Sequence, residues 1–122
     1  MKKMILLIVG TLIFLCAESA LANKAVVRLE APENATQGEK IKITLFVTHS
    51  ANNFFHHTKR VYLKINGQEK ASWEFSGFNL PEAKVFNRSF EYVMDGPINL
   101  ESAAFCNIHG SANTATATIG LK

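Results

Sequence analysis

Apolar and polar side chains alternate along most of the chain after Lys24, and this period of two is the strongest constraint on its fold. The clearest example runs from Ile41 through Ile43 and Leu45 to Val47, with other residues between them. Successive strand side chains point to opposite faces, so this alternation predicts a half-buried β-strand. No long stripe with a 3.6-residue period accompanies it, and we expect no helix in this part of the chain.

Turn residues divide the alternating pattern into about seven short strands. We expect these strands at residues 25–30, 41–47, 60–65, 68–75, 85–93, 98–105 and 114–119. Asn66-Gly67 is the strongest hairpin signal, because a type I′ turn needs positive φ at both positions. Residues 31–38 are expected to form a loop, and Trp73 and the phenylalanines to form the core. The pattern predicts an all-β protein, an immunoglobulin-like antiparallel β-sandwich.

The first 22 residues are typical of a secretory signal peptide. A lysine pair precedes an apolar run at 4–15, and Ala-Leu-Ala at 20–22 fits a cleavage site. The apolar run is too short for a comfortable membrane span, so we expect no stable membrane insertion after cleavage. Cleavage after Ala22 would leave one domain, residues 23–122. The lysine pair and the compact apolar run favour export to a bacterial periplasm.

Net charge and cysteine content limit the classes of function that the domain at 23–122 can have. The chain has 13 basic and 10 acidic residues; removing two lysines and one glutamate with the leader leaves 11 and 9, a net charge of +2. This mild balance argues against a nucleic-acid binder. Cys106 is the one cysteine left after cleavage, so it has no disulfide partner within the domain. It is a buried spectator, a reactive group, an intermolecular link or a metal ligand, and the nearby His109 favours the last.

The histidines and this cysteine fall into two clusters, each at a predicted strand end or loop. The candidate metal ligands are His49, His56, His57, Cys106 and His109. Loops at one end of a sandwich come together, and Gly110 allows a tight loop after the Cys-His pair because glycine takes positive φ easily. Imidazole and thiolate suit iron, copper or zinc. Each residue also has a plainer interpretation, as a loop histidine or a small buried cysteine, but together they predict a metal site.

The segment Cys106-Asn107-Ile108-His109-Gly110, preceded by a loop that ends in His56-His57, resembles the superoxide reductase family, which includes desulfoferrodoxin and neelaredoxin. The resemblance covers most of residues 23–122. It implies an oxidoreductase with one iron ion that cycles between Fe²⁺ and Fe³⁺, held by four histidines and a cysteine thiolate. It further implies reduction of superoxide to hydrogen peroxide with electrons from an external donor protein. A lysine, here Lys24, would attract the anionic substrate.

The chain departs from the family pattern in two places. A Glu-Lys-His triplet ahead of the first strand corresponds here to Asn23-Lys24-Ala25, which keeps the lysine but lacks one iron ligand and a glutamate. The spacing from His49 to His56 is one residue longer than in the family, so either His56 or His57 could be the ligand. The resemblance then implies a site of three histidines and one thiolate.

Two other functions stay open at this point. A blue-copper electron carrier, with copper in place of iron, also has a cysteine followed closely by histidine, but no methionine follows Cys106 as the weak axial ligand. A non-catalytic exported sandwich domain that binds a protein or stores a metal is the other alternative. The sequence does not decide the metal, the electron donor or the oligomeric state.

Overall fold

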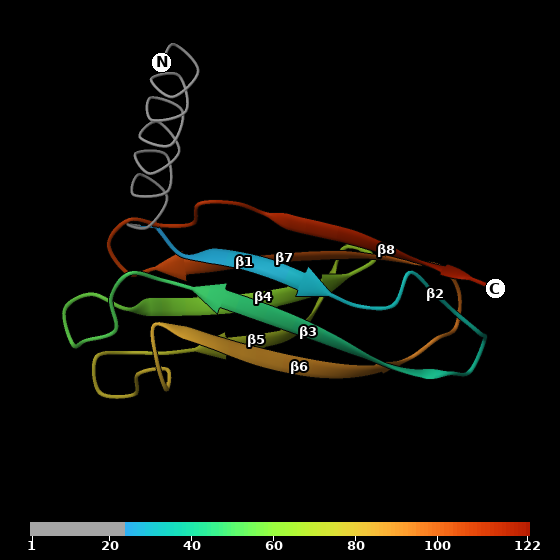
Figure 1. Ribbon diagram of the computed structural model, residues 1–122, viewed down its shortest axis with the longest axis horizontal. Helices are drawn as coiled ribbons and strands as arrows, with labels where there is room; N and C mark the ends of the chain where they lie inside the picture. The colour runs from blue at the N-terminus through green and yellow to red at the C-terminus, as the bar shows by residue number, and fades with distance from the viewer. Residues whose placement is uncertain (1–23) are drawn as a thin grey trace, which may run out of the picture.

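Two β-sheets packed face to face make up the part of the protein that the computed structural model describes, residues 24–122 (Figure 1). One sheet has three strands in the order β1-β3-β6, and the other has five in the order β2-β8-β7-β4-β5. The strands are β1 (Val26–Glu30), β2 (Asn34–Ala35), β3 (Lys40–Thr48), β4 (Thr58–Ile65), β5 (Gln68–Glu74), β6 (Val85–Val93), β7 (Ile98–Cys106) and β8 (Ala115–Leu121). The predicted all-β sandwich is confirmed.

The expected signal peptide lies outside the described residues, so the leader at 1–22 and the domain boundary after Ala22 stay predictions. Within residues 24–122 there is no helix that is long and apolar enough to cross a membrane.

The hairpin between β4 and β5 turns at the predicted dipeptide. Asn66 has a φ of 51° and Gly67 a φ of 82°, so both positions are in the left-handed region that a type I′ turn requires. At its other end, β4 begins at Thr58, two residues earlier than expected. Its pairing with β7 continues to the pair Thr58–Cys106. This extension brings the end of the histidine-rich loop against the end of β7.

The expected loop at 31–38 contains a short strand that the sequence pattern did not predict. β2 has only two residues and pairs in parallel with β8. Ala35 is fully buried there, and its carbonyl accepts a hydrogen bond from the Lys122 N–H at 3.1 Å. A two-residue strand is too short to show the alternation of apolar and polar side chains. It is recognised only by its pairing with β8.

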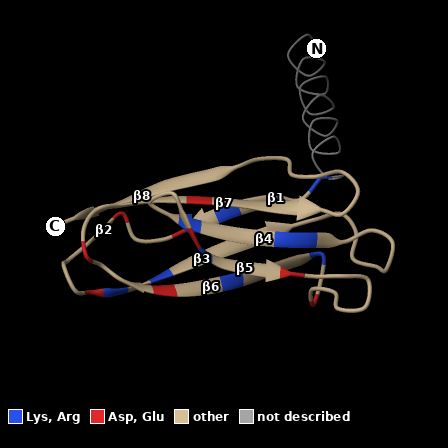
Figure 2. Cartoon of the chain, turned by 180° about the vertical axis from the view of Figure 1, so that it is seen from behind, with Lys and Arg blue, Asp and Glu red and all other residues tan. Residues whose placement is uncertain are grey.

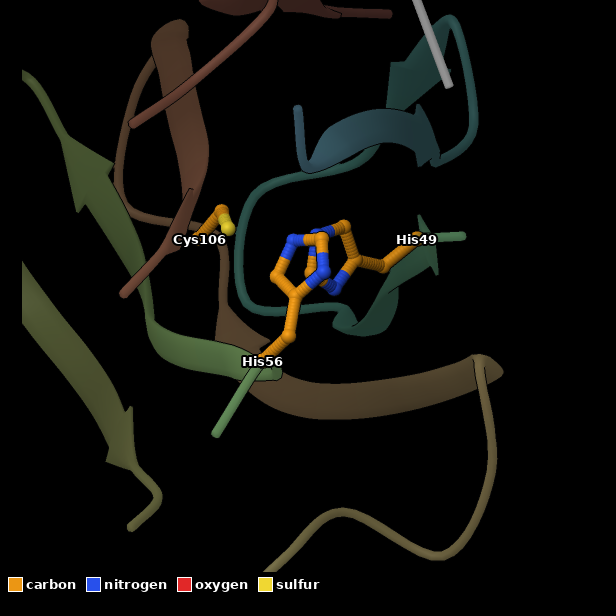
Figure 3. Close-up of side chains that lie close together, drawn as sticks. All are labelled: His49, His56 and Cys106. Atoms are coloured by element: carbon orange, nitrogen blue, oxygen red, sulfur yellow. The ribbon is translucent and has the colours of Figure 1, made fainter. Parts of the chain in front are cut away.

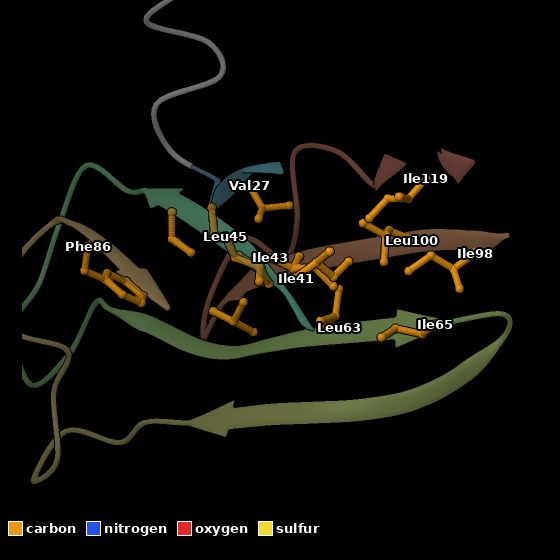
Figure 4. Close-up of a cluster of buried hydrophobic side chains, with 14 of the residues drawn as sticks. Val27, Ile41, Ile43, Leu45, Leu63, Ile65, Phe86, Ile98, Leu100 and Ile119 are labelled. Atoms are coloured by element: carbon orange, nitrogen blue, oxygen red, sulfur yellow. The ribbon is translucent and has the colours of Figure 1, made fainter. Parts of the chain in front are cut away.

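The core fills the space between the two sheets with the inward residues of the alternating strands (Figure 4). Its fully buried large side chains include Ile43, Leu45, Leu63, Ile65, Ile98, Leu100 and Ile119. The expectation that the phenylalanines form the core is wrong for three of them: Phe54, Phe55 and Phe78 are 47%, 78% and 93% exposed. These three lie in loops, where no second sheet covers them, while Phe86 is buried in β6.

Truncating the centre of this core should cost much of the stability of the domain. Leu45 is fully buried in β3 between the sheets, so Leu45→Ala removes buried methyl groups and leaves a cavity. We expect the free energy of unfolding, measured by urea titration, to fall by about 2–5 kcal/mol. Leu121→Ala is the matched control, because Leu121 is 41% exposed, and its change should stay below about 1 kcal/mol. Equal losses for both variants would contradict this placement of the core.

Candidate metal centre

Two loops that are far apart in the sequence meet at one end of the sandwich, the β3–β4 loop (49–57) and the β7–β8 loop (107–114) (Figure 1). Asn107 joins them. Its N–H donates to the His57 carbonyl at 3.0 Å, and its Oδ1 accepts the His57 N–H at 3.0 Å. Its Nδ2 donates to the carbonyl of Phe55 at 3.1 Å. One side chain thus fastens the histidine-rich loop to the Cys-His corner.

His49, His56 and Cys106 form a group in which one potential ligand atom from each lies within 4.8 Å of the others. Figure 3 shows the His49 and His56 rings together, with the Cys106 sulfur to one side of them. The two ring centroids are 4.8 Å apart and the ring planes are nearly perpendicular, at 88°. Cys106 and His49 are buried, and His56 is half-buried. This is the arrangement that a small metal site needs.

His109 lies beside this group on its exposed side. Its Nδ1 is 3.3 Å from His56 Nε2 and 3.8 Å from Cys106 Sγ. The His56 and His109 ring centroids are 5.0 Å apart. The His109 imidazole therefore lies beside both His56 and Cys106.

His57 has a different environment from its neighbour. Its ring is buried, and its Nδ1–H donates to the carbonyl of Asn53 at 3.0 Å. It is not part of the group of three potential ligands, which contains His56. The Asn53 side chain also sets the position of His56, because its Oδ1 accepts the N–H groups of Phe55 and His56, each at 3.0 Å. This turn is typical of asparagine in a loop.

The sulfur of Cys106 accepts two backbone hydrogen bonds. The N–H groups of Ile108 and His109 each point to it at 3.4 Å. Such donors stabilise the negative charge of a thiolate, which is the form of cysteine that binds metals. Gly110 closes the loop with a φ of 76°, as predicted, and its carbonyl accepts the Cys106 N–H at 2.9 Å.

The residue at the missing histidine position lies next to this loop. Ala25 is fully buried and pairs with Ser111, its N–H donates to the Gly110 carbonyl at 3.4 Å, and its carbonyl accepts the Ala112 N–H at 2.9 Å. Alanine offers no ligand atom there. Lys24, the residue before it, is exposed. The sequence pattern did not indicate the roles of Asn53 and Asn107, beyond the presence of an asparagine in each loop.

Three imidazoles and one thiolate fit a first-row transition metal such as iron, copper or zinc better than they fit Mg²⁺ or Ca²⁺, which prefer oxygen ligands. His49, His56, Cys106 and His109 bring this donor set to one place. The residues present therefore fit the iron that the sequence resemblance implies, with one imidazole fewer at Ala25.

The fold and this donor set define a small β-sandwich protein with a candidate histidine–cysteine metal centre. A family model described as desulfoferrodoxin matches residues 17–114, and the chain belongs to this family. It is thereby a member of a superoxide reductase-like group of oxidoreductases that bind a mononuclear iron.

Solved structures show the same fold. The superoxide reductase (neelaredoxin) from Ignicoccus hospitalis is similar with a TM-score of 0.68 and 18% identity, covering 81% of this chain and 82% of that chain. The CARDB domain of a Pyrococcus furiosus protein, solved in complex with di-metal ions, has a TM-score of 0.62 and 14% identity, covering 80% and 87%. The sulfur carrier protein SoxY from Chlorobium limicola has a TM-score of 0.59 and 14% identity, covering 93% and 98%. At these identities the likeness shows the fold alone. No curated protein matches the sequence.

Proposed function

We propose that the protein is an exported mononuclear iron protein that reduces superoxide to hydrogen peroxide with electrons from an external donor protein. The observation that carries this proposal is the convergence of His49, His56 and Cys106 on one place, in a chain of the desulfoferrodoxin family. Export to the periplasm, with cleavage after Ala22, belongs to the same proposal and is supported by the leader sequence.

In this proposal His49, His56 and His109 hold the iron with their ring nitrogens and Cys106 holds it with its thiolate. His57 is the alternative to His56, but the group of three potential ligands contains His56 and not His57, which favours His56. When bound, iron would supply the single electron that, together with two protons, converts superoxide to hydrogen peroxide.

The exposure of the proposed metal ligands determines the side from which an anion can approach the site. Cys106 and His49 are buried, whereas His56 is half-buried and His109 is exposed. A solvent anion therefore meets the imidazoles before it meets the sulfur. The Ile108 and His109 N–H groups donate to Cys106 Sγ, and Asn107 keeps the two loops together.

Lys24 is proposed to attract superoxide by its charge. Lys24→Ala should slow superoxide capture several-fold at low ionic strength and much less at high ionic strength, because salt screens attraction between exposed charges. Stopped-flow rates across a salt series measure this effect. Lys70→Ala, an exposed lysine in β5, is the matched control. An unchanged rate for Lys24→Ala at low salt would make Lys24 a solvated bystander.

Two measurements test the function itself. Metal analysis of the protein purified from its own compartment should find about one iron per chain, and pulse radiolysis should show rapid loss of superoxide. Copper with an intense blue colour would instead indicate an electron carrier. The blue-copper interpretation lacks a methionine as axial ligand, because Met94 is buried at the opposite end of β6 from the site. Bound metal without a fast reaction would indicate a non-catalytic binding domain.

A further inference from the structure

An exposed apolar patch lies at the same end of the sandwich as the candidate metal centre. It comprises Phe54, Phe55, Phe78 and Ile108, which are 47%, 78%, 93% and 60% exposed, and we call it the apolar tip. Its residues come from three loops, β3–β4, β5–β6 and β7–β8. The Phe54 ring lies edge-to-face with both Phe55 and Phe78, with 5.0 Å between centroids in each pair. The three rings therefore form one continuous cluster.

The apolar tip is held in place by its own loops. The ring of Phe54 packs so closely over Gly77 that a Cβ there would lie 2.6 Å from it. The Phe55 backbone is fixed on both sides, because its N–H donates to Asn53 Oδ1 and its carbonyl accepts from Asn107 Nδ2. An exposed apolar patch that is held in place marks a surface that binds a protein, a membrane or a ligand.

Exposed lysines lie at the same end of the sandwich as the apolar tip. Lys24, Lys59 and Lys84 are exposed at this end of the sandwich, and none of them belongs to an ion pair among residues 24–122. Figure 2 shows both basic and acidic segments at this end. Of the acidic residues nearby, Glu82 is paired with Arg88 at 2.9 Å, and Glu74 is exposed. The unpaired charge around the tip is therefore predominantly positive and suits an anionic surface.

We propose that the apolar tip adsorbs reversibly to an anionic lipid bilayer, with its phenylalanines in the interface and the lysines among the headgroups. Aromatic side chains and basic residues together favour this position. The chain itself favours a bilayer over a protein partner. The apolar run at 4–15 ends nine residues before Lys24, a span of at most about 32 Å. Because Ala25 pairs with Ser111, Lys24 lies beside the β7–β8 loop, so in the proposed export this end of the domain lies next to the membrane until the leader is cleaved.

Adsorption of this kind is peripheral and needs no membrane-spanning helix. It also does not depend on bound iron or on superoxide reduction. The membrane test can therefore fail while the proposed function stands, and the proposed function can fail while membrane binding stands.

The test is co-sedimentation of the exported, processed protein with phosphatidylcholine vesicles that contain or lack phosphatidylglycerol. We expect binding to the anionic vesicles that weakens as sodium chloride is raised. The double variant Phe55→Ser/Phe78→Ser should bind roughly tenfold more weakly, because it removes apolar area from the interface. Lys84→Glu should reduce binding by more than the about fivefold expected for one lysine, since it also adds a negative charge.

Matched controls lie at the other end of the sandwich. Val93→Ser removes an exposed apolar residue there, 53% exposed, and Lys70→Glu reverses an exposed charge; neither should change binding. Phe78→Trp in a Trp73→Phe background gives a second readout, because position 78 is nearly fully exposed and then carries the one tryptophan, which brominated lipid should quench.

Absence of binding to anionic vesicles at low salt overturns the proposal, as does equal binding by the phenylalanine variant or an unquenched Trp at position 78. If sedimentation velocity instead shows a dimer that the phenylalanine variant loses, the tip is an interface between two copies of this chain, and the membrane proposal is equally overturned.

Discussion

Cys106→Ser is expected to abolish the coloured ferric form and to lower the rate of superoxide reduction by about 100-fold or more. The buried sulfur is the one strongly electron-donating ligand of the group, and a serine hydroxyl does not replace it, because a hydroxyl stays protonated and binds iron weakly. Visible absorption of the oxidised protein and stopped-flow kinetics with superoxide measure the two effects.

Ala104→Ser is the matched control for this variant. It places the same hydroxyl at a fully buried position of β7, two residues before the cysteine and outside the ligand group. It should keep the colour and most of the rate. Circular dichroism of the metal-free variants separates loss of the site from loss of the fold. A Cys106→Ser protein that keeps both colour and rate would remove the thiolate from the proposed site.

His56→Ala and His57→Ala are expected to differ sharply in iron affinity. His56 Nε2 lies 3.3 Å from His109 Nδ1 and belongs to the group with Cys106, so its loss should weaken iron binding at least tenfold. His57 lies outside that group, and its ring holds the loop through its bond to the Asn53 carbonyl. His57→Ala should therefore keep most of the iron affinity but lower the free energy of unfolding by about 1–3 kcal/mol.

Competitive chelator titration measures the two affinities, and urea unfolding of the metal-free proteins measures the stabilities. The adjacent histidines are each other's control, because the substitution is the same and the positions differ by one residue. If His57→Ala loses iron and His56→Ala retains it, the ligand assignment is reversed.

The sequence predicted the features that depend on local chemistry. The alternation from Ile41 to Val47 predicted a half-buried strand, and the Asn66-Gly67 dipeptide predicted the hairpin, because side-chain parity and positive φ are properties of a few neighbouring residues. Gly110 predicted the tight turn after the cysteine for the same reason. The composition of the two clusters predicted a metal-binding chemistry.

Tertiary contacts decided what local patterns could not show. β2 is visible only through its pairing with β8, and the exposure of Phe78 depends on which surfaces the second sheet covers. An aromatic residue has the same apolar character in a loop as in a core, so its burial is not encoded at its own position. The phenylalanines assigned to the core by composition therefore include three that form the apolar tip.

The clearest division is between His56 and His57. The sequence by itself determined that a histidine pair, a distant histidine and a Cys-His corner could supply a soft donor set. Only the folded chain placed the ring of His56 beside Cys106 and the ring of His57 on a backbone carbonyl. Asn107 of the other loop binds the backbone on both sides of His56, at Phe55 and at His57, and no local pattern contains such a distant partner.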